Sequence, residues 1–202
     1  MYFCIQFENN MQNICVYCAS SSSVRKSYFD AAEKLGKILA ENDIRLIYGG
    51  GHRGLMGRIA DTVLSSGGKV TGVIPGFMCE VEWNHTGLTE LVMVDSMHER
   101  KEMLARLADA VVALPGGCGT MEELLEVITW KRLGIFTKPI IICNTEGYFD
   151  PLIEMLNRSV DENFMGEHHR KIWEVVTDPE KIMHAISVSE PWDESARQTA
   201  AL

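Results

Sequence analysis

Short apolar runs alternate with amphipathic stretches along most of the chain. The runs are apolar throughout, as strands are when helices cover both sides of a parallel sheet, and the longer stretches repeat apolar residues at helical spacing. The pattern predicts strands at Asn13–Cys18, Ile44–Tyr48, Lys69–Ile74, Leu91–Val94, Ala110–Leu114, Pro139–Cys143 and Trp173–Val176. It predicts helices at Ser27–Asn42, Gly54–Ser65, Ser96–Leu107, Thr120–Leu133, Asp150–Asn163 and Pro179–Ile186, with a loop from Pro75 to about Thr89.

This order of elements predicts an α/β fold, in which helices cover both faces of a parallel sheet. A chain of 202 residues fits one large domain. We expect that domain over residues 13–187, with an N-terminal tail over 1–12 and a C-terminal tail over 188–202. Ligands of such sheets bind at the carboxyl ends of the strands, so the loops that follow strands are the candidate sites.

Composition and charge narrow the range of partners. The formal net charge of −9 argues against a nucleic-acid binder or a membrane-surface binder, because those partners favour a basic face. A small anionic ligand is still compatible with a locally positive pocket. Residues 1–12 lack the features of a secretory signal, and no run reaches the ~18 apolar residues of a membrane span. With six cysteines and no export features, we expect reduced thiols in a cytoplasmic protein.

The strongest candidate site is the run Pro-Gly-Gly-Cys-Gly-Thr-Met-Glu-Glu at residues 115–123, which follows a predicted strand and opens a predicted helix. Glycines let the backbone approach a ligand closely, and a helix start presents unpaired N–H groups to an anion. The run therefore predicts a phosphate site, although it lacks the lysine of a Walker A loop. As an alternative, Thr120 and Glu123 fit a capping box, which would explain both residues without a ligand.

A second glycine run, at residues 49–54, also lies between a strand and a helix. It matches G-x-G-x-x-G, but the acidic residue of a dinucleotide fingerprint is absent at the end of the next strand. Gly50 and Gly51 could face a phosphate, or the run could serve a close contact between helix and strand. Ser20, after the first strand, could contact the ligand or belong to an ordinary serine-rich turn.

Charged residues near strand ends give further candidates. Arg100 and Lys101 open a helix after the fourth strand and could meet a phosphate or a ribose, or they could lie on a solvated face with a His98–Glu102 pair. Glu82 lies in the long loop, and loops of this length are often functional. Without other support, the residue indicates surface charge only. No metal site is predicted, because Cys15-x-x-Cys18 lacks a second ligand pair.

Taken together, these segments resemble the LOG ("lonely guy") family of cytokinin riboside 5′-monophosphate phosphoribohydrolases, often mislabelled "possible lysine decarboxylase". The resemblance covers about Ile14 to Ile186 and rests on four motifs in the family's order. They are P-G-G-x-G-T-x-x-E at Pro115–Glu123, M-H-x-R-K at Met97–Lys101, Y-G-G-G…G-L-M-G at Tyr48–Gly57 and E-x-x-H-x-G-L-T-E-L at Glu82–Leu91. No motif departs from the pattern, and Cys118 fills the variable place of the first.

The resemblance implies a Rossmann-like, doubly wound fold and a homodimer with sites near its interface. It implies a hydrolase that cleaves the N-glycosidic bond of a purine nucleoside 5′-monophosphate, a cytokinin nucleotide or AMP, and releases the base and ribose 5-phosphate. It implies no metal and no organic cofactor. Arg100 and Glu123 correspond to the catalytic pair. The implied substrate contacts are Glu82, Lys101, Gly116, Gly117, Gly119, Thr120, Glu122 and Thr129.

The implied reaction is consistent with the residues. Breaking an N-glycosidic bond builds positive charge on the ribose, and a carboxylate at Glu123 could stabilise that charge while the phosphate fixes the sugar. The main alternative is a non-catalytic module that binds or senses nucleotides. A nicotinamide-dependent dehydrogenase is a third hypothesis, and it rests on the weak glycine motif at Gly49 alone.

Overall fold

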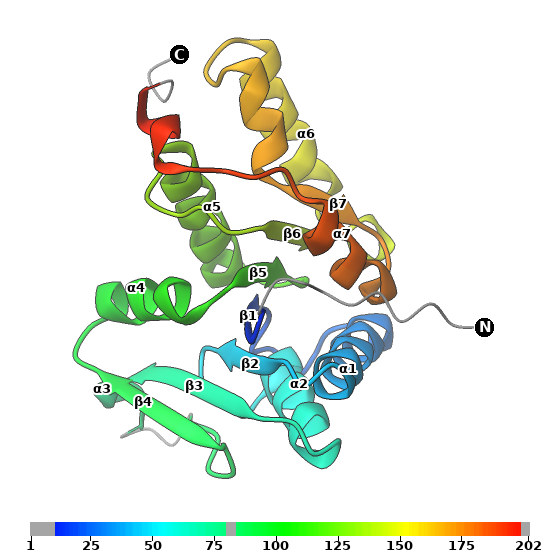
Figure 1. The fold of residues 1–202 in the computed structure, drawn as a ribbon. Helices are drawn as coiled ribbons and strands as arrows, with labels where there is room; N and C mark the ends of the chain where they lie inside the picture. The colour runs from blue at the N-terminus through cyan, green and yellow to red at the C-terminus, as the bar shows by residue number, and fades with distance from the viewer. Residues whose placement is uncertain (1–10, 80–83, 199–202) are drawn as a thin grey trace.

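The chain folds around a seven-stranded sheet with helices on both faces (Figure 1). The computed structural model describes residues 11–79 and 84–198. The strands are β1 (Asn13–Tyr17), β2 (Arg45–Tyr48), β3 (Val70–Pro75), β4 (Glu90–Val94), β5 (Ala110–Ala113), β6 (Ile140–Cys143) and β7 (Glu174–Val176). The α-helices are α1 (Lys26–Glu41), α2 (Gly54–Ser65), α3 (Gly76–Cys79), α4 (Met97–Leu107), α5 (Cys118–Arg132), α6 (Asp150–Asp161) and α7 (Ile182–Val188). Short 3-10 turns lie at Thr145–Gly147, Glu167–Ile172, Pro179–Lys181 and Glu194–Gln198.

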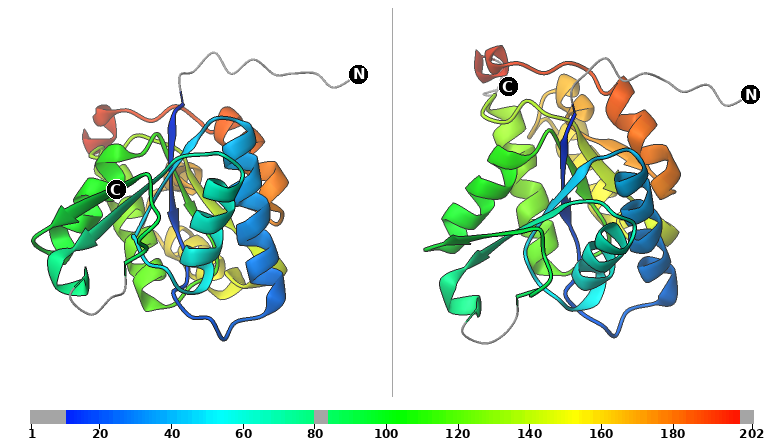
Figure 2. Two further views of the ribbon diagram at one scale, coloured as in Figure 1. Left: turned by 90° about the horizontal axis from the view of Figure 1, so that it is seen from below. Right: turned by 60° about the horizontal axis from the view of Figure 1, so that its bottom comes forward.

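The strand order is β4-β3-β2-β1-β5-β6-β7, and every neighbouring pair is parallel. Figure 2 shows β1 in the middle of the sheet, between the two helix layers. The chain first adds strands on one side of β1 and then, from β5, on the other side. The order therefore reverses between β1 and β5, and this switch point is where open α/β sheets form a ligand crevice. The predicted doubly wound parallel fold is confirmed.

Two hydrophobic cores lie on opposite faces of the sheet. One core packs α1, α2 and α7 against the sheet, and the other packs α4, α5 and α6. Along β1 the side chains alternate, so that Ile14 and Val16 enter the first core while Cys15 and Tyr17 enter the second. Burial on both faces is the reason why this strand is apolar at every position.

The predicted elements are all present, and most of their ends lie within two residues of the prediction. The predicted loop after Pro75 contains α3, whose four residues are too few to show a helical period in the sequence. The last predicted helix begins as a 3-10 turn at Pro179 and continues as α7. None of the described helices is long and apolar enough to cross a membrane.

The C-terminal segment packs on the domain over its described part. Trp192, expected in a tail, contacts the second core and donates a hydrogen bond from Nε1 to the carbonyl oxygen of Lys131, at 2.7 Å. The indole ring also lies 5.6 Å from Nζ of Lys131. A single tryptophan in a polar segment has no periodic pattern, so the sequence carries no signal for this contact.

Lys131 is 1% exposed, and its burial lowers the pKa of its ammonium group to about 8, while the charge of Glu174 acts in the opposite direction. Above this pKa the folded protein loses the proton, whereas an unfolded chain keeps it until about pH 10.5. The unfolded state then binds more protons, so stability rises with pH in this window. At neutral pH the folded protein bears the cost of burying a charge.

Lys131→Met tests this cost, because it keeps the apolar stem and removes the charge. We expect the free energy of unfolding of the wild type to rise relative to the variant between pH 8 and pH 10, by about 1–3 kcal/mol. Urea denaturation of both proteins across this range measures the difference. Parallel pH curves would show that the buried ammonium group carries no such cost.

Candidate functional site

A cavity of about 520 Å³ lies at the carboxyl ends of the central strands. Segments that follow β1, β2 and β5 meet there, together with the end of β3 and residues of α2, α4 and α5. It is lined by Cys18, Ala19, Ser20, Gly49, Gly51, His52, Arg53, Met56, Ile74, Met78, Arg100, Gly117, Cys118, Gly119, Thr120 and Glu123. The cavity therefore occupies the crevice at the switch point between β1 and β5.

The run at residues 115–123 forms the turn from β5 into α5. The helix begins at Cys118 with Gly117 as its N-cap residue, two residues earlier than predicted. Thr120 therefore lies in the first turn and Glu123 in the second, on the same face of the helix. The capping-box interpretation is wrong, because Glu123 is too far into the helix to reach the N-cap and its carboxylate bonds to Arg100 instead.

Gly117 and Gly119 face the open space of the cavity. A Cβ atom added to either would have no neighbour within 4 Å, and neither residue has a positive φ. Packing against neighbours therefore does not require glycine at these two positions, and Gly117 occupies the N-cap, where glycine is among the favoured residues. Unpaired N–H groups of the first turn of α5 lie beside this space, as an anion site requires. Gly116 differs, because its Cβ would lie 2.1 Å from Oγ1 of Thr120.

A buried ion pair joins α4 to α5 beside these glycines. Nη1 of Arg100 donates to Oε1 of Glu123 at 2.8 Å, and the two side chains are 6% and 9% exposed. Arg100 also donates from Nε to the carbonyl oxygen of Val73, at 3.1 Å, and from Nη2 to that of Gly49, at 3.4 Å. The interpretation of Arg100 as part of a solvated helix face is therefore wrong.

Burial and the neighbouring charge of Arg100 have opposite effects on the pKa of the Glu123 carboxylate. Burial raises the pKa of Glu123 above its ordinary value, while the guanidinium group of Arg100 opposes that rise. The result is a carboxylate that touches the cavity and keeps one fixed cationic partner. Among the described residues, no hydrogen bond is directed at its second oxygen, Oε2.

Lys101 and Glu122 lie outside the cavity and pair with each other. Nζ of Lys101 lies 2.5 Å from Oε1 of Glu122 and 3.2 Å from Oε1 of Glu126, and its side chain is 9% exposed. The carboxylates raise the pKa of the Lys101 ammonium group, although its burial opposes the rise. Lys101 therefore joins α4 to the side of α5 that faces away from the cavity.

The structure thus divides the predicted site residues into four groups. Those that line the cavity are Ser20, Gly51, Arg100, Gly117, Gly119, Thr120 and Glu123. Gly50 and Gly116 are next to lining residues in the sequence but do not line the cavity themselves, and their carbonyl oxygens accept bonds from the His85 backbone N–H and the Tyr148 hydroxyl. Lys101, Glu122 and Thr129 are not among its lining residues. Glu82 lies outside the described residues.

The second glycine run serves close packing and Arg100. A Cβ atom on Gly49 would lie 2.0 Å from Nη2 of Arg100, so a side chain there would displace the guanidinium group. Gly54 has φ +62° and lies against the backbone of Ser20, where a Cβ would approach to 2.5 Å. These contacts explain the glycines without a pyrophosphate and argue against the dehydrogenase hypothesis. Gly51 still lines the cavity.

The cavity also contains residues that were not predicted from the sequence. Met56, Ile74 and Met78 form an apolar wall, and His52 and Arg53 lie at its edge. Nε of Arg53 bonds to Nε2 of His52 at 3.3 Å. Met56 lies within the G-L-M-G element, which was the only signal available for this wall. The other residues come together through the fold alone.

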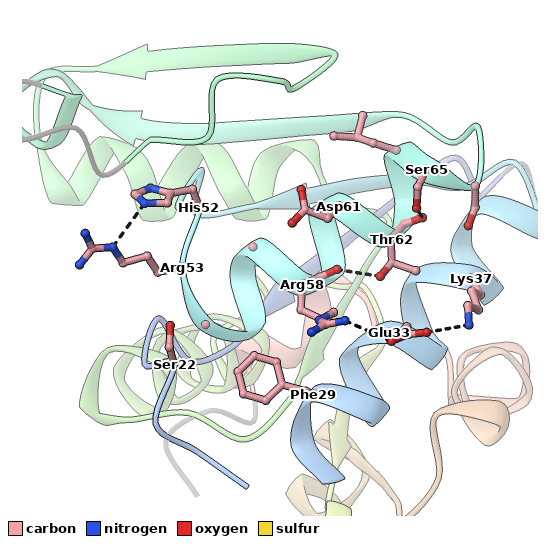
Figure 3. Close-up of a pocket in the computed structure, with 14 residues that line it drawn as sticks. Ser22, Phe29, Glu33, Lys37, His52, Arg53, Arg58, Asp61, Thr62 and Ser65 are labelled. Carbon is pink, nitrogen blue, oxygen red and sulfur yellow. Dashed lines mark hydrogen bonds and ion pairs between the residues drawn. The ribbon is translucent and has the colours of Figure 1, made fainter. Parts of the chain in front are cut away.

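A larger and more open groove of about 880 Å³ lies on the surface formed by α1 and α2, whose side chains line much of it (Figure 3). Its charged side chains pair with one another, since Glu33 bonds to Lys37 at 2.8 Å and to Arg58 at 3.4 Å. The groove lacks the glycine-lined helix start and the buried carboxylate, so we assign the functional site to the smaller cavity. Among residues 11–79 and 84–198, no group of three or more potential ligands could hold a metal ion.

Together, the fold and the cavity define a Rossmann-like α/β protein with a glycine-lined helix start and a buried carboxylate at its switch point. Residues 56–186 match the family model described as "Possible lysine decarboxylase". With this match and the relatives below, the chain belongs to that family, the LOG family.

The similar sequences carry the name cytokinin riboside 5′-monophosphate phosphoribohydrolase. LOG from Oryza sativa subsp. japonica is 47% identical over 164 residues, which cover 81% of this chain and 68% of that protein. LOG2 from Arabidopsis thaliana is 45% identical, covering 82% and 78%. LOG7 from Arabidopsis thaliana is 40% identical, covering 94% and 92%.

Solved structures share the fold. The X-ray structure of TM1055 has a TM-score of 0.68 and 26% identity, covering 87% of this chain and 98% of that one. The molybdenum cofactor carrier protein from Chlamydomonas reinhardtii has a TM-score of 0.66 and 21% identity, covering 87% and 96%. At this identity the carrier protein supports the architecture and nothing further.

Removing one partner of the Arg100–Glu123 ion pair should lower the free energy of unfolding, and neutralising the other partner as well should restore part of it. Arg100→Met leaves the Glu123 carboxylate buried without its partner, and we expect a loss of about 3 kcal/mol at pH 7. Adding Glu123→Gln removes the charge and should restore a large part of that loss. Urea denaturation of the single and double variants measures both effects, and equal losses in the two would exclude the ion pair as the cause.

Proposed function

We propose that this protein hydrolyses the N-glycosidic bond of a purine nucleoside 5′-monophosphate and releases the free base and ribose 5-phosphate. The proposal rests on one juxtaposition in the cavity. The Glu123 carboxylate lies one helical turn beyond a helix start whose glycines leave room for an anion. The names of the LOG relatives support the same reaction.

The phosphate would bind at the start of α5. Gly117, Gly119 and Thr120 border the open space there, and the positive end of the helix dipole favours an anion. Arg53 at the cavity edge and Arg100 beneath it add positive charge within a chain of net charge −9. Binding of this remote group would supply energy for positioning the sugar above the carboxylate.

The chemical step would take place at C1′ of the ribose. Cleavage of the bond to the base builds positive charge on the sugar ring, and the Glu123 carboxylate would stabilise that charge and orient the attacking water. Arg100 would hold Oε1 of Glu123 and keep the group ionised against the effect of burial. Arginine stays protonated in proteins, so it would not donate the proton to the leaving base. The attacking water would bond through its oxygen to C1′, and the proton that it releases would balance the proton taken up by the leaving base. No step requires a group from a cofactor.

The apolar wall suits the base. Met56, Ile74 and Met78 border the cavity with flexible or branched apolar side chains, and thioethers pack well against aromatic rings. A purine, with or without an apolar N6 substituent, would fit this chemistry better than a charged group. We therefore propose both AMP and its N6-isopentenyl analogue as substrates.

A non-catalytic nucleotide-binding module would use the same helix start. It would have no use for the ion pair, because burying two charges brings little net stability. The position of Arg100 and Glu123 at the cavity surface is the observation that favours an enzyme. We also propose a cytoplasmic setting, supported by the free thiols of Cys15, Cys18, Cys79, Cys118 and Cys143.

We further propose that the protein acts as a homodimer with its sites near the interface. Glu122, Leu125 and Thr129 follow one another at helical spacing on α5, Leu133 follows at its C-cap, and all four are exposed to solvent. Two of them, Glu122 and Thr129, are contacts implied by the family, yet they lie outside the cavity of their own chain. If a second copy packed on this stripe, Glu122 and Thr129 of the first copy would lie near the substrate bound by the second copy.

Replacing the carboxylate should separate turnover from binding. We expect wild-type protein to release free base from AMP or N6-isopentenyl-AMP, with far less release from adenosine, which lacks the phosphate. Glu123→Gln should lower kcat by about 10³-fold and leave nucleotide affinity within a few-fold. Chromatography of the free base and calorimetric titration measure the two properties.

Glu154→Gln on α6 serves as the matched control, because that carboxylate is exposed and is not among the residues that line the cavity. Release of no base from any purine monophosphate by folded wild-type protein would reject the proposed reaction. Full activity of Glu123→Gln would reject the proposed role of that carboxylate.

Placing a charge on the outer stripe of α5 should separate the two copies. Leu125 is 39% exposed in the single chain, so Leu125→Asp should preserve the fold while it prevents apolar packing between copies. We expect wild-type protein to have the mass of a dimer in light scattering and the variant to have that of a monomer with reduced turnover. Phe164→Asp, at a residue 71% exposed elsewhere, should change neither property. A monomeric wild type would contradict the assignment.

A further inference from the structure

The segment 84–87 lies directly on the second glycine run. Asn84 forms a bridge with Gly51, and the backbone N–H of His85 donates to the carbonyl oxygen of Gly50 at 2.8 Å. Gly50 has φ +76°, a conformation in which glycine is favoured and which its neighbours must hold in place. The outer side of the glycine turn 49–51 is therefore fixed by two contacts to this segment.

The His85 ring fastens the segment to α2. The backbone N–H of Gly87 donates to Nδ1 at 3.0 Å, so in the neutral ring the proton lies on Nε2. Nε2 lies 2.9 Å from Oδ1 of Asp61, and the His85 side chain is 14% exposed. Figure 3 shows Asp61 on α2, in the groove that Arg58 and Glu33 also line. His85 thus joins the glycine turn, its own segment and α2.

The inner side of the same turn contacts Arg100. Nη2 of Arg100 donates to the carbonyl oxygen of Gly49, and a Cβ on Gly49 would collide with that nitrogen. The turn therefore accepts a hydrogen bond from His85 at Gly50 and one from Arg100 at Gly49, so its backbone links the two residues. Any shift of the turn would move the acceptor that orients the guanidinium group, and with it the Glu123 carboxylate.

The His85–Asp61 pair contributes little to the stability of the fold. Asp61 is 69% exposed, and ion pairs at exposed sites contribute about 0–1 kcal/mol. What the pair does contribute is a fixed direction for the segment that holds the turn. Small displacements of groups that orient a reacting centre can cost about 10²-fold in rate.

We propose that His85 and Asp61 are positioning residues for the hydrolytic reaction, and that they act by holding the glycine turn 49–51 against Arg100. This inference rests on the proposed function. It assigns a role to two side chains that do not belong to the phosphate site, so their loss should affect kcat more than KM.

Kinetics of matched variants test the proposal. We expect His85→Ala and Asp61→Ala each to lower kcat about tenfold while KM stays within about twofold. Asp61→Asn should retain most of the rate, because its amide oxygen can still accept from Nε2. The double variant His85→Ala/Asp61→Ala should be no slower than either single variant, since both remove one linkage. Asp30→Ala, which removes an exposed ion pair on α1, should have no effect.

A second measurement keeps the inference separate from the reaction itself. The Nε–H resonance of Arg100, assigned by its loss in Arg100→Lys, reports the bond to Val73 without any substrate. We expect it to shift or broaden in His85→Ala and Asp61→Ala, and to stay in place in Asp61→Asn and Asp30→Ala. If wild-type protein releases no base, the proposed function fails and this resonance alone decides the positioning role.

Three results would overturn the inference. One is an unchanged Arg100 resonance in His85→Ala. Another is an equal loss of rate in Asp61→Asn and Asp61→Ala. The third is a fall in kcat that is fully explained by a smaller folded fraction in thermal denaturation.

Discussion

The buried contact between Arg100 and Glu123 is the constraint on which the site depends. It connects α4 to α5 across the switch point, and the remaining nitrogens of Arg100 bind carbonyl oxygens at the end of β3 and after β2. Segments from four parts of the chain are thereby held around one guanidinium group. A buried ion pair of this kind brings little net stability, because desolvation offsets the attraction between the charges. Its effect is to fix the direction of a carboxylate at the surface of a cavity, and it explains why Gly49 has no room for a side chain.

The local electrostatics differ from those of the whole chain. The protein carries a net charge of −9, yet its cavity combines a helix start with Arg53 and Arg100. The helix start contributes through N–H groups that lack partners, so it attracts an anion without adding a titratable group. Among the described residues that line the cavity, Glu123 is the one carboxylate. Burial raises its pKa above the ordinary value, and the charge of Arg100 opposes that rise. An acidic protein thus presents a locally positive helix start beside the Glu123 carboxylate.

Much of the fold could be predicted from sequence, and the reasons are local. Strands buried on both faces are apolar at every position, as in Ile14–Tyr17, and the glycine turns mark where strands pass into helices. The site was harder to predict from the sequence than the fold, because its residues come from separate segments of the chain. The start of α5 at Cys118 depends on backbone geometry that a capping pattern does not reveal, and burial of Arg100 depends on the neighbouring carbonyl groups. The contact of Trp192 with Lys131 and the short helix α3 have no period to detect. Met78 enters the cavity only through that short helix.

The period of α5 explains why residues next to each other in sequence serve different places. Glu123 and Thr120 are three residues apart and share the face that borders the cavity. Glu122 is turned about 100° from Glu123 and lies seven residues before Thr129, on the outward stripe. A sequence motif records all of these residues together, although the helix separates them by direction. The inward face holds a carboxylate against Arg100, while the outward face pairs Glu122 with Lys101. Arg100 and Lys101 of α4 therefore each meet one face of α5, so the geometry of this helix pair governs both the cavity and the surface beside it.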